Sequence, residues 1–338
     1  MPKVWRRVWG THMANIVFDE GDREYARNII KEFLETFELA SFKNKCADHG
    51  VKILYRNAVE LGCLTGLIVE RIYSRTPFSM LRAGDGEGNV LSLALPGSRP
   101  ERDMKWLNSV FQMMDGQTIS TADGKRIASS MANAFDNADV IGTRLFRHGD
   151  ENGVYDETKW FLDVLSKGET RGPVGALKAI QFVESLIDDN NNNKDESRIL
   201  TSAWVHLYFI EQLDTFIKYA EKVIVISGRT ELADKFATRY VAKNIEFVGI
   251  PLQASDFNTG GRIPHYPRRY NETISKIQEN ARGALVLVGA GIFGKMYCDI
   301  AKRSGGIALD MGSAFDLLAG AATRPIHERI DIKNIKWI

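Results

Sequence analysis

The sequence predicts an α/β fold in which helices cover both faces of a parallel sheet. From residue 222 onward, short continuous apolar segments alternate with amphipathic ones. We expect strands at 222–227, 245–251, 284–289 and 307–311, and helices at 231–243, 268–281 and 293–304. Strands that are apolar on both sides belong to sheets covered on both faces, and strict alternation with helices gives parallel pairing. This half of the chain therefore predicts a Rossmann-like sheet.

The first half predicts mainly helices, interrupted by two strands. Apolar residues recur with helical spacing over 22–40, 51–73, 98–114 and 121–137, and Thr121 or Asp123 suits the N-cap of the last helix. Two short apolar runs, 80–83 and 138–142, end in small or polar residues, as buried strands do where they open into loops.

These patterns suggest one main domain with an addition at its start. We expect residues 1–50 to form a helical N-terminal extension and residues 51–338 to form a single α/β domain. The segment DDNNNNKDES at 188–197 has no apolar residue, so it predicts a solvated surface loop.

Composition excludes several classes of protein. The chain of 338 residues carries 44 Lys and Arg against 43 Asp and Glu, a net charge of +1, which argues against a nucleic-acid-coating protein. Cys46, Cys63 and Cys298 form no C-x-x-C pair, so we expect reduced thiols. No segment approaches the ~20 apolar residues of a membrane span, so we expect a cytoplasmic protein. The segment WRRVW at 5–9 is either a packed arm or a peripheral contact with the inner membrane.

Parallel sheets bind ligands beyond the carboxyl ends of their strands, so the residues after each strand are the candidates. The first such segment is RAGDGEGN at 82–89. Asp85 and Glu87 lie two apart in a glycine-rich strand-to-loop turn, where both carboxylates can reach one Mg²⁺ or Mn²⁺ ion. The alternative is a plain Asp-Gly turn between a strand and a helix.

The second candidate is the turn GAGIFG at 289–294, which follows a strand and opens a helix. Its spacing is that of a dinucleotide fingerprint, and Asp310 at the end of the next strand is the expected acidic residue. The turn comes near the end of the chain, however, whereas this fingerprint normally opens a domain. The alternative is a turn that holds a phosphate or another anion at the helix N-terminus.

Single residues after other strands are further candidates. Arg229 follows strand 222–227, where it either neutralises a phosphate or is a solvated arginine beside an N-cap. Arg144 follows strand 138–142. His265, in the loop RIPHYPRR after strand 245–251, is a candidate base, although no pair of histidines has metal-ligand spacing.

The order of these motifs resembles a bacterial family of glycosyltransferases with the GT-D fold. The most specific element is an arginine, a small residue and GDGE, here Arg82 followed by 84–87. ADVIGTRLF at 138–146, VIVISG at 223–228, VGIPLQ at 248–253 and the segment 287–312 match later parts of the pattern, so the resemblance spans residues 75–320. Ser227 stands where the family usually has glutamate, and Ser313 where it often has histidine.

The resemblance implies transfer of a sugar from a nucleotide-sugar donor, UDP-linked in our expectation, to a glycan or glycoconjugate acceptor. It implies a Mn²⁺ or Mg²⁺ ion held by Asp85 and Glu87, which would stabilise the departing diphosphate. The expected nucleotide-binding residues are Arg82, Gly84, Gly86, Arg229, Gly289, Gly291 and Asp310. Two alternatives stay open: an NAD(P)-dependent oxidoreductase using the GAGIFG turn, and a non-catalytic nucleotide-binding module. The oligomeric state is open as well.

Overall fold

The protein contains one sheet of eight parallel strands. A computed structural model describes residues 16, 18–55, 58–146, 170–188, 198–253, 264–324 and 327. Across the sheet the strands run in the order β1 (Lys52–Ile53), β4 (Ile199–Ser202), β3 (Val140–Thr143), β2 (Phe78–Ala83), β8 (Ile307–Asp310), β7 (Leu285–Gly289), β5 (Lys222–Ser227) and β6 (Asn244–Gly249). Every neighbouring pair is parallel. The predicted α/β class is therefore confirmed.

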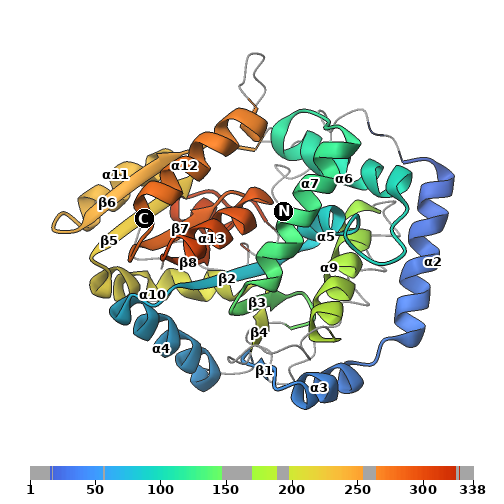
Figure 1. Ribbon diagram of the computed structural model, residues 1–338, viewed down its shortest axis with the longest axis horizontal. Helices are drawn as coiled ribbons and strands as arrows, with labels where there is room; N and C mark the ends of the chain where they lie inside the picture. The colour runs from blue at the N-terminus through green and yellow to red at the C-terminus, as the bar shows by residue number, and fades with distance from the viewer. Residues whose placement is uncertain are drawn as a thin grey trace, which may run out of the picture.

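Helices cover both faces of this sheet, and each face has its own apolar core (Figure 1). One core is formed with α4 (Ala58–Ser74), α10 (Val205–Tyr219), α11 (Glu231–Arg239) and α14 (Ala314–Leu318). The other is formed with α3 (Leu39–Asp48), α5 (Asp85–Leu91), α6 (Pro100–Asp115), α7 (Thr121–Asp136), α9 (Arg171–Asp188), α12 (Tyr270–Asn280) and α13 (Phe293–Arg303). Within β2, Met80 belongs to the first core and Leu81 to the second, because successive side chains of a strand point to opposite faces.

Several boundaries differ from the sequence expectation. The segment 51–73 is not one helix, because Lys52 and Ile53 pair with β4 and the helix begins only at Ala58. The N-cap of α7 is Ser120, whose Oγ accepts a hydrogen bond from the backbone N–H of Asp123 at 3.1 Å, rather than Thr121 or Asp123. The described chain also contains β4, α9 and α10 between residues 170 and 220, where no elements were predicted.

The described part of the expected N-terminal extension packs on the main body. The helix α2 (Glu20–Thr36) buries Ile30 against Ala176 and Leu177 of α9. Its Ala26 contacts Trp106 of α6. Figure 1 shows α2 on the right of the molecule, outside α6 and α9. Residues 5–9, and all but the first residue of the polar segment 188–197, lie outside the described residues.

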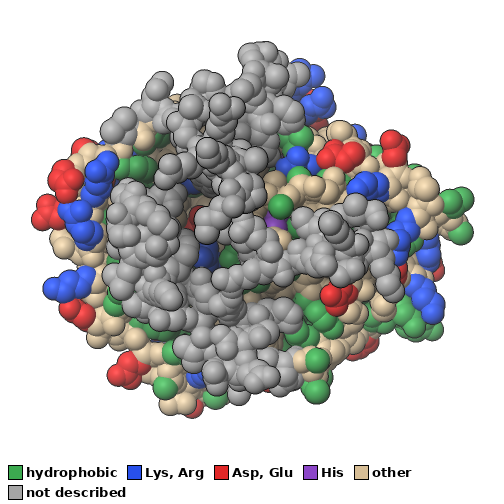
Figure 2. Space-filling model, turned by 180° about the vertical axis from the view of Figure 1, so that it is seen from behind, with side chains coloured by type: hydrophobic (Ala, Val, Ile, Leu, Met, Phe, Trp, Pro, Cys, Tyr) green, Lys and Arg blue, Asp and Glu red, His purple; other side chains and the backbone are tan. Residues whose placement is uncertain are grey.

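The surface and the thiols agree with the composition. Over the described part of the face in Figure 2, acidic and basic side chains are interspersed. None of the described helices is long and apolar enough to cross a membrane. All three cysteines are free thiols, and burial raises the pKa of Cys46 to about 11.

The order of the strands defines where a ligand is expected. Strand β2 leads into α5 on one face of the sheet, whereas its neighbour β8 leads into α14 on the other face. The two connections diverge, so the carboxyl ends of these adjacent strands form a topological switch point. Such a switch point is the usual ligand site of an open α/β sheet.

Candidate functional site

The GDGE segment forms the start of a helix rather than a strand-to-loop turn. Helix α5 begins at Asp85, and the Oε2 atom of Glu87 accepts the backbone N–H of Gly84 at 3.0 Å. The helix lies against α9 so closely that a Cβ atom on Gly88 would come within 1.7 Å of the Gly175 carbonyl oxygen. At least this glycine therefore serves helix packing rather than the binding of a ligand.

Two acidic residues from distant parts of the chain converge on one buried lysine. The Nζ atom of Lys295, in α13, lies 2.5 Å from Oε1 of Glu87 and 2.9 Å from Oδ2 of Asp310. The side chains of Lys295 and Asp310 are each 1% exposed. Burial lowers the pKa of Lys295, but Asp310 and Glu87 together outweigh it, so the net shift is upward and the ammonium stays charged.

Arg82 completes this cluster from the end of β2. Its Nη2 atom lies 3.2 Å from Oδ1 of Asp310. Burial raises the pKa of Asp310, and the opposing effect of Arg82 and Lys295 is larger, so the net shift is downward. Two positive and two negative side chains thus form a neutral buried group, which we call the four-charge cluster: Arg82, Glu87, Lys295 and Asp310.

Asp85 points to a different partner. Its side chain is 45% exposed, and its Oδ1 atom lies 3.7 Å from Nη1 of Arg144, which follows β3. The guanidinium of Arg144 lies over the ring of Trp204, 5.5 Å from the centroid. Arg144, which the sequence marked by its position alone, is thus brought to the same edge as the GDGE segment.

The predicted metal pair fits a divalent cation poorly in this arrangement. Glu87 has one oxygen on the Lys295 ammonium and the other on the Gly84 amide, whereas Asp85 is partly exposed beside Arg144. Among the described residues, His, Cys, Asp and Glu form no group of three that could hold a metal ion. A chelate formed by Asp85 and Glu87 is therefore not preassembled.

Two histidines that the sequence did not single out meet at Ser313, next to the four-charge cluster. The Nε2 atoms of His206 and His327 lie 3.2 and 3.1 Å from Oγ of Ser313. The Nη1 atom of Arg82 lies 3.1 Å from Nδ1 of His206. Burial holds the pKa of His206 well below its usual range, with Arg82 adding to the shift, and burial lowers the pKa of His327 to about 4. Both imidazoles are therefore neutral at pH 7.

The same chain of contacts reaches Arg229 at the end of β5. The Nδ1 atom of His327 accepts the backbone N–H of Thr323 at 3.1 Å, and the Thr323 hydroxyl donates to Oδ2 of Asp316 at 2.5 Å. The other oxygen of Asp316 accepts a hydrogen bond from Nε of Arg229 at 2.7 Å. Arg229 is therefore fixed by a carboxylate from α14, and it is not a freely solvated arginine.

The glycines of the GAGIFG turn are explained by packing. Gly291 has a φ of +53°, and a Cβ atom there would lie 1.7 Å from Cε of Met114. A Cβ atom on Gly289 would lie 2.5 Å from the ring of Phe315. Asp310, the acidic residue of the fingerprint, is buried on Lys295 and Arg82 rather than presented to a ribose. This geometry disfavours the dinucleotide interpretation.

His265 lies in the helical layer, among aromatic rings. Its Nε2 atom is 2.6 Å from the Tyr297 hydroxyl, and its ring centroid is 4.5 Å from that of Phe293. Its backbone N–H donates to Asp115. His265 is only 5% exposed, which suits a packing role better than that of the predicted base.

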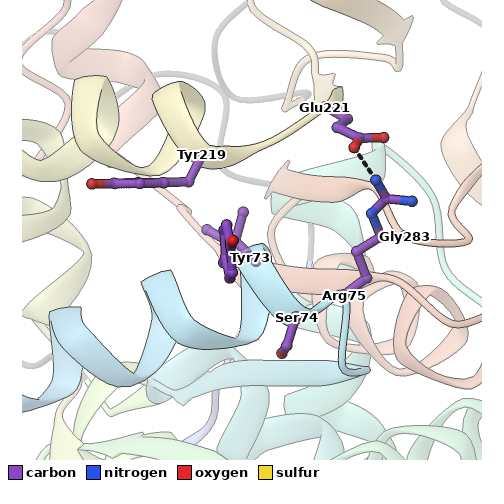
Figure 3. A pocket seen from close by; sticks show the side chains of 7 residues that line it. Tyr73, Ser74, Arg75, Tyr219, Glu221 and Gly283 are labelled. Carbon is purple, nitrogen blue, oxygen red and sulfur yellow. Dashed lines mark hydrogen bonds and ion pairs between the residues drawn. The ribbon is translucent and has the colours of Figure 1, made fainter.

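A separate pocket of about 440 Å³ lies at the opposite, amino edge of the sheet (Figure 3). It is lined by residues that precede β2, β5 and β7, among them Tyr73, Tyr219 and Gly283. Figure 3 shows the ion pair between Arg75 and Glu221 at its side. None of the sequence-predicted site residues lines this pocket.

Comparisons with known proteins give a limited likeness. No protein-family model and no curated protein sequence matches the chain. A solved structure described as "The highly conserved domain of unknown function 1792 has a distinct glycosyltransferase fold" aligns with a TM-score of 0.44 and 14% identity, over 84% of this chain and 87% of that one. A selenomethionine-substituted structure of the same domain aligns with a TM-score of 0.42 and 12% identity, over 83% and 86%.

Proposed function

We propose that this protein is a glycosyltransferase that moves a sugar from a nucleotide-sugar donor, UDP-linked in this proposal, to a glycan or glycoconjugate acceptor. The proposal rests on three arginines at the carboxyl edge of the sheet. Arg82 lies near the end of β2, whereas Arg144 and Arg229 follow β3 and β5, and each lies near a carboxylate, at 3.2, 3.7 and 2.7 Å respectively. Guanidinium groups fixed in this way suit the oxygens of a diphosphate.

The chemistry of sugar transfer matches such an edge. The acceptor oxygen forms a bond to the anomeric carbon as the bond from that carbon to the diphosphate oxygen breaks. The diphosphate leaves with the bonding electrons, and positioned arginines stabilise the charge that develops on it. The RAGDGE segment, on which the family resemblance depends, lies at this same edge.

The divalent cation remains a prediction from the sequence. No step of the proposed transfer uses this cation, because Glu87 is already neutralised by Lys295. A cytoplasmic location and a membrane contact through residues 5–9 likewise remain predictions.

Titration calorimetry with UDP and with NADH tests the function. We expect UDP to bind, and Arg144→Ala to weaken binding about tenfold, the loss of one charge-assisted contact. Arg75→Ala, at the amino edge, is the matched control and should leave the affinity unchanged. Binding of NADH without UDP would favour the oxidoreductase, and UDP binding without turnover of any nucleotide-sugar would favour the non-catalytic module.

A further inference from the structure

The Lys295 ammonium is surrounded by the kind of ligands that a divalent metal ion uses. Besides Glu87 and Asp310, it contacts the carbonyl oxygen of Gly291 at 3.2 Å. Two carboxylates and a backbone carbonyl around one point are a typical oxygen donor set for Mg²⁺ or Mn²⁺. At this point the protein supplies its own cation, on a side chain that is 1% exposed.

We propose that Lys295 is a built-in replacement for a metal ion, so that the four-charge cluster of the wild-type protein holds no divalent cation. Glu87 and Asp310 make both of the carboxylate contacts, whereas Asp85 makes none of them. The inference concerns metal binding alone, so it holds whether or not the protein transfers sugars.

The charges of the four-charge cluster exclude a metal ion there as long as the Lys295 ammonium is present. The two carboxylates of the four-charge cluster are already matched by Arg82 and Lys295. A divalent ion added beside them would leave two uncompensated positive charges in a buried place, which is strongly unfavourable. Metal and ammonium are therefore mutually exclusive here.

Removing the ammonium should turn the cluster into a metal site. Lys295→Met keeps an unbranched side chain but lacks the terminal ammonium, so Glu87 and Asp310 are left around a vacated point with only Arg82 to balance them. We expect this variant to bind one Mn²⁺ ion, seen as loss of the free-ion signal in electron paramagnetic resonance. At a hundredfold excess over Kd, Mn²⁺ should raise its Tm by about 3–4 °C.

The wild-type protein and two further variants are the controls. Lys302→Met removes another ammonium of the same helix, one that lies 2.7 Å from Asp139 and is partly exposed, and should bind no Mn²⁺ at the cluster. The double variant Lys295→Met with Glu87→Gln restores the charge balance and should also bind none. The wild type should keep its Tm unchanged in Mn²⁺ and in EDTA.

Three outcomes would overturn the proposal. One is stoichiometric Mn²⁺ binding by the wild type that Glu87→Gln abolishes. Another is a folded Lys295→Met protein that binds no Mn²⁺. If that variant is unfolded without metal, Mn²⁺ should restore its circular dichroism spectrum, and failure to do so is the third. None of these measurements uses a nucleotide, so a failure of the proposed function would be seen separately.

Discussion

At the scale of single residues, Gly312, just after β8, determines the position of Arg82. Its φ is +42°, and a Cβ atom there would lie 1.7 Å from Nη2 of Arg82. The missing side chain is what allows the guanidinium to lie between the backbone after β8 and the buried carboxylate of Asp310. The conformation of one glycine thus determines where the arginine of the RAGDGE segment points.

Gly312→Ala should displace Arg82 and leave Asp310 with one partner fewer. We expect the free energy of unfolding to fall by about 2 kcal/mol more than in Gly320→Ala. Gly320 also has a positive φ, of +89°, but a Cβ atom there would meet nothing within 4 Å, so that variant measures backbone strain alone. Urea denaturation of the two variants gives the comparison, and equal losses would contradict the role given to Arg82.

His327 should make the protein less stable in weak acid. Burial lowers the pKa of His327 from 6.5 to about 4. Between these two pH values the imidazole is therefore protonated in the unfolded chain and neutral in the folded chain. The folded state then loses stability as the pH falls from 6.5 to about 4, by on the order of 2 kcal/mol after allowing for solvent screening. His327→Gln should show a smaller fall over this range in urea denaturation. An identical fall would assign the acid sensitivity to other groups.

The sequence singled out most of the charged residues at this edge but not the contacts among them. Arg82, Glu87 and Asp310 were predicted as ligands of a metal or nucleotide, and the structure brings them together around Lys295 in the four-charge cluster. Lys295 escaped notice because a lysine in an amphipathic helix is usually solvated. His206 and His327 are far apart in sequence, so no spacing pattern could have paired them.

At the scale of elements, the contact between α5 and α9 positions the acidic segment. Gly88 of α5 faces Gly175 of α9, and a Cβ atom on Gly175 would lie 1.9 Å from the Asp85 carbonyl oxygen. The amide of Asn89 donates to that carbonyl and to the carbonyl of Arg171, at 3.0 and 3.1 Å. The short helix that carries Glu87 is thus held in place by its contact with α9.

Gly88→Ala should push the two helices apart. The added methyl group would meet backbone atoms that cannot move separately, so we expect a loss of about 2–3 kcal/mol of stability. Gly62→Ala is the matched control, because Gly62 lies in α4 with nothing within 4 Å of its Cβ position. That variant should gain about 0.5–1 kcal/mol from helix propensity. Thermal unfolding of both variants distinguishes them by the sign of the change in Tm.

Elements were predicted well where they are long and regular. Strand β5 at 222–227 has the predicted bounds, and β7, α13 and β8 differ by one residue at an end. Strand β1 has two residues, too few for a pattern to stand out. Helix α9 carries Gly172, Pro173 and Gly175 in its first turns. Glycine and proline are typical of loops, so the sequence did not indicate this helix, in which Gly175 allows the close contact with α5.

At the scale of the whole molecule, the two edges of the sheet have different properties. The carboxyl edge carries the arginines and the four-charge cluster, whereas the amino edge carries the 440 Å³ pocket with the exposed ring of Tyr73. The order of the strands could not be predicted, because it depends on which distant segments pair. The site between β2 and β8 follows from that order, so it too was out of reach from the sequence.

Tyr73→Ala should leave nucleotide binding unchanged, even though it removes a large side chain from the pocket. The ring is 77% exposed, so its loss should also change stability by less than about 0.5 kcal/mol. UDP calorimetry and urea denaturation check the two statements. A loss of UDP affinity comparable to that of Arg144→Ala would move the binding site to the amino edge.

The pairing of β2 with β8 also has a consequence for biosynthesis. Arg82 and Asp310 are separated by 228 residues, so a ribosome that adds 5–20 residues per second needs roughly 10–45 s to deliver the second after the first. Throughout that interval one side of β2 has no strand to pair with. Unpaired apolar strand edges are the surfaces that nascent chains expose to chaperones and to each other. Because β2 pairs with β8, β2 waits longer than any other described strand for its second neighbour during synthesis.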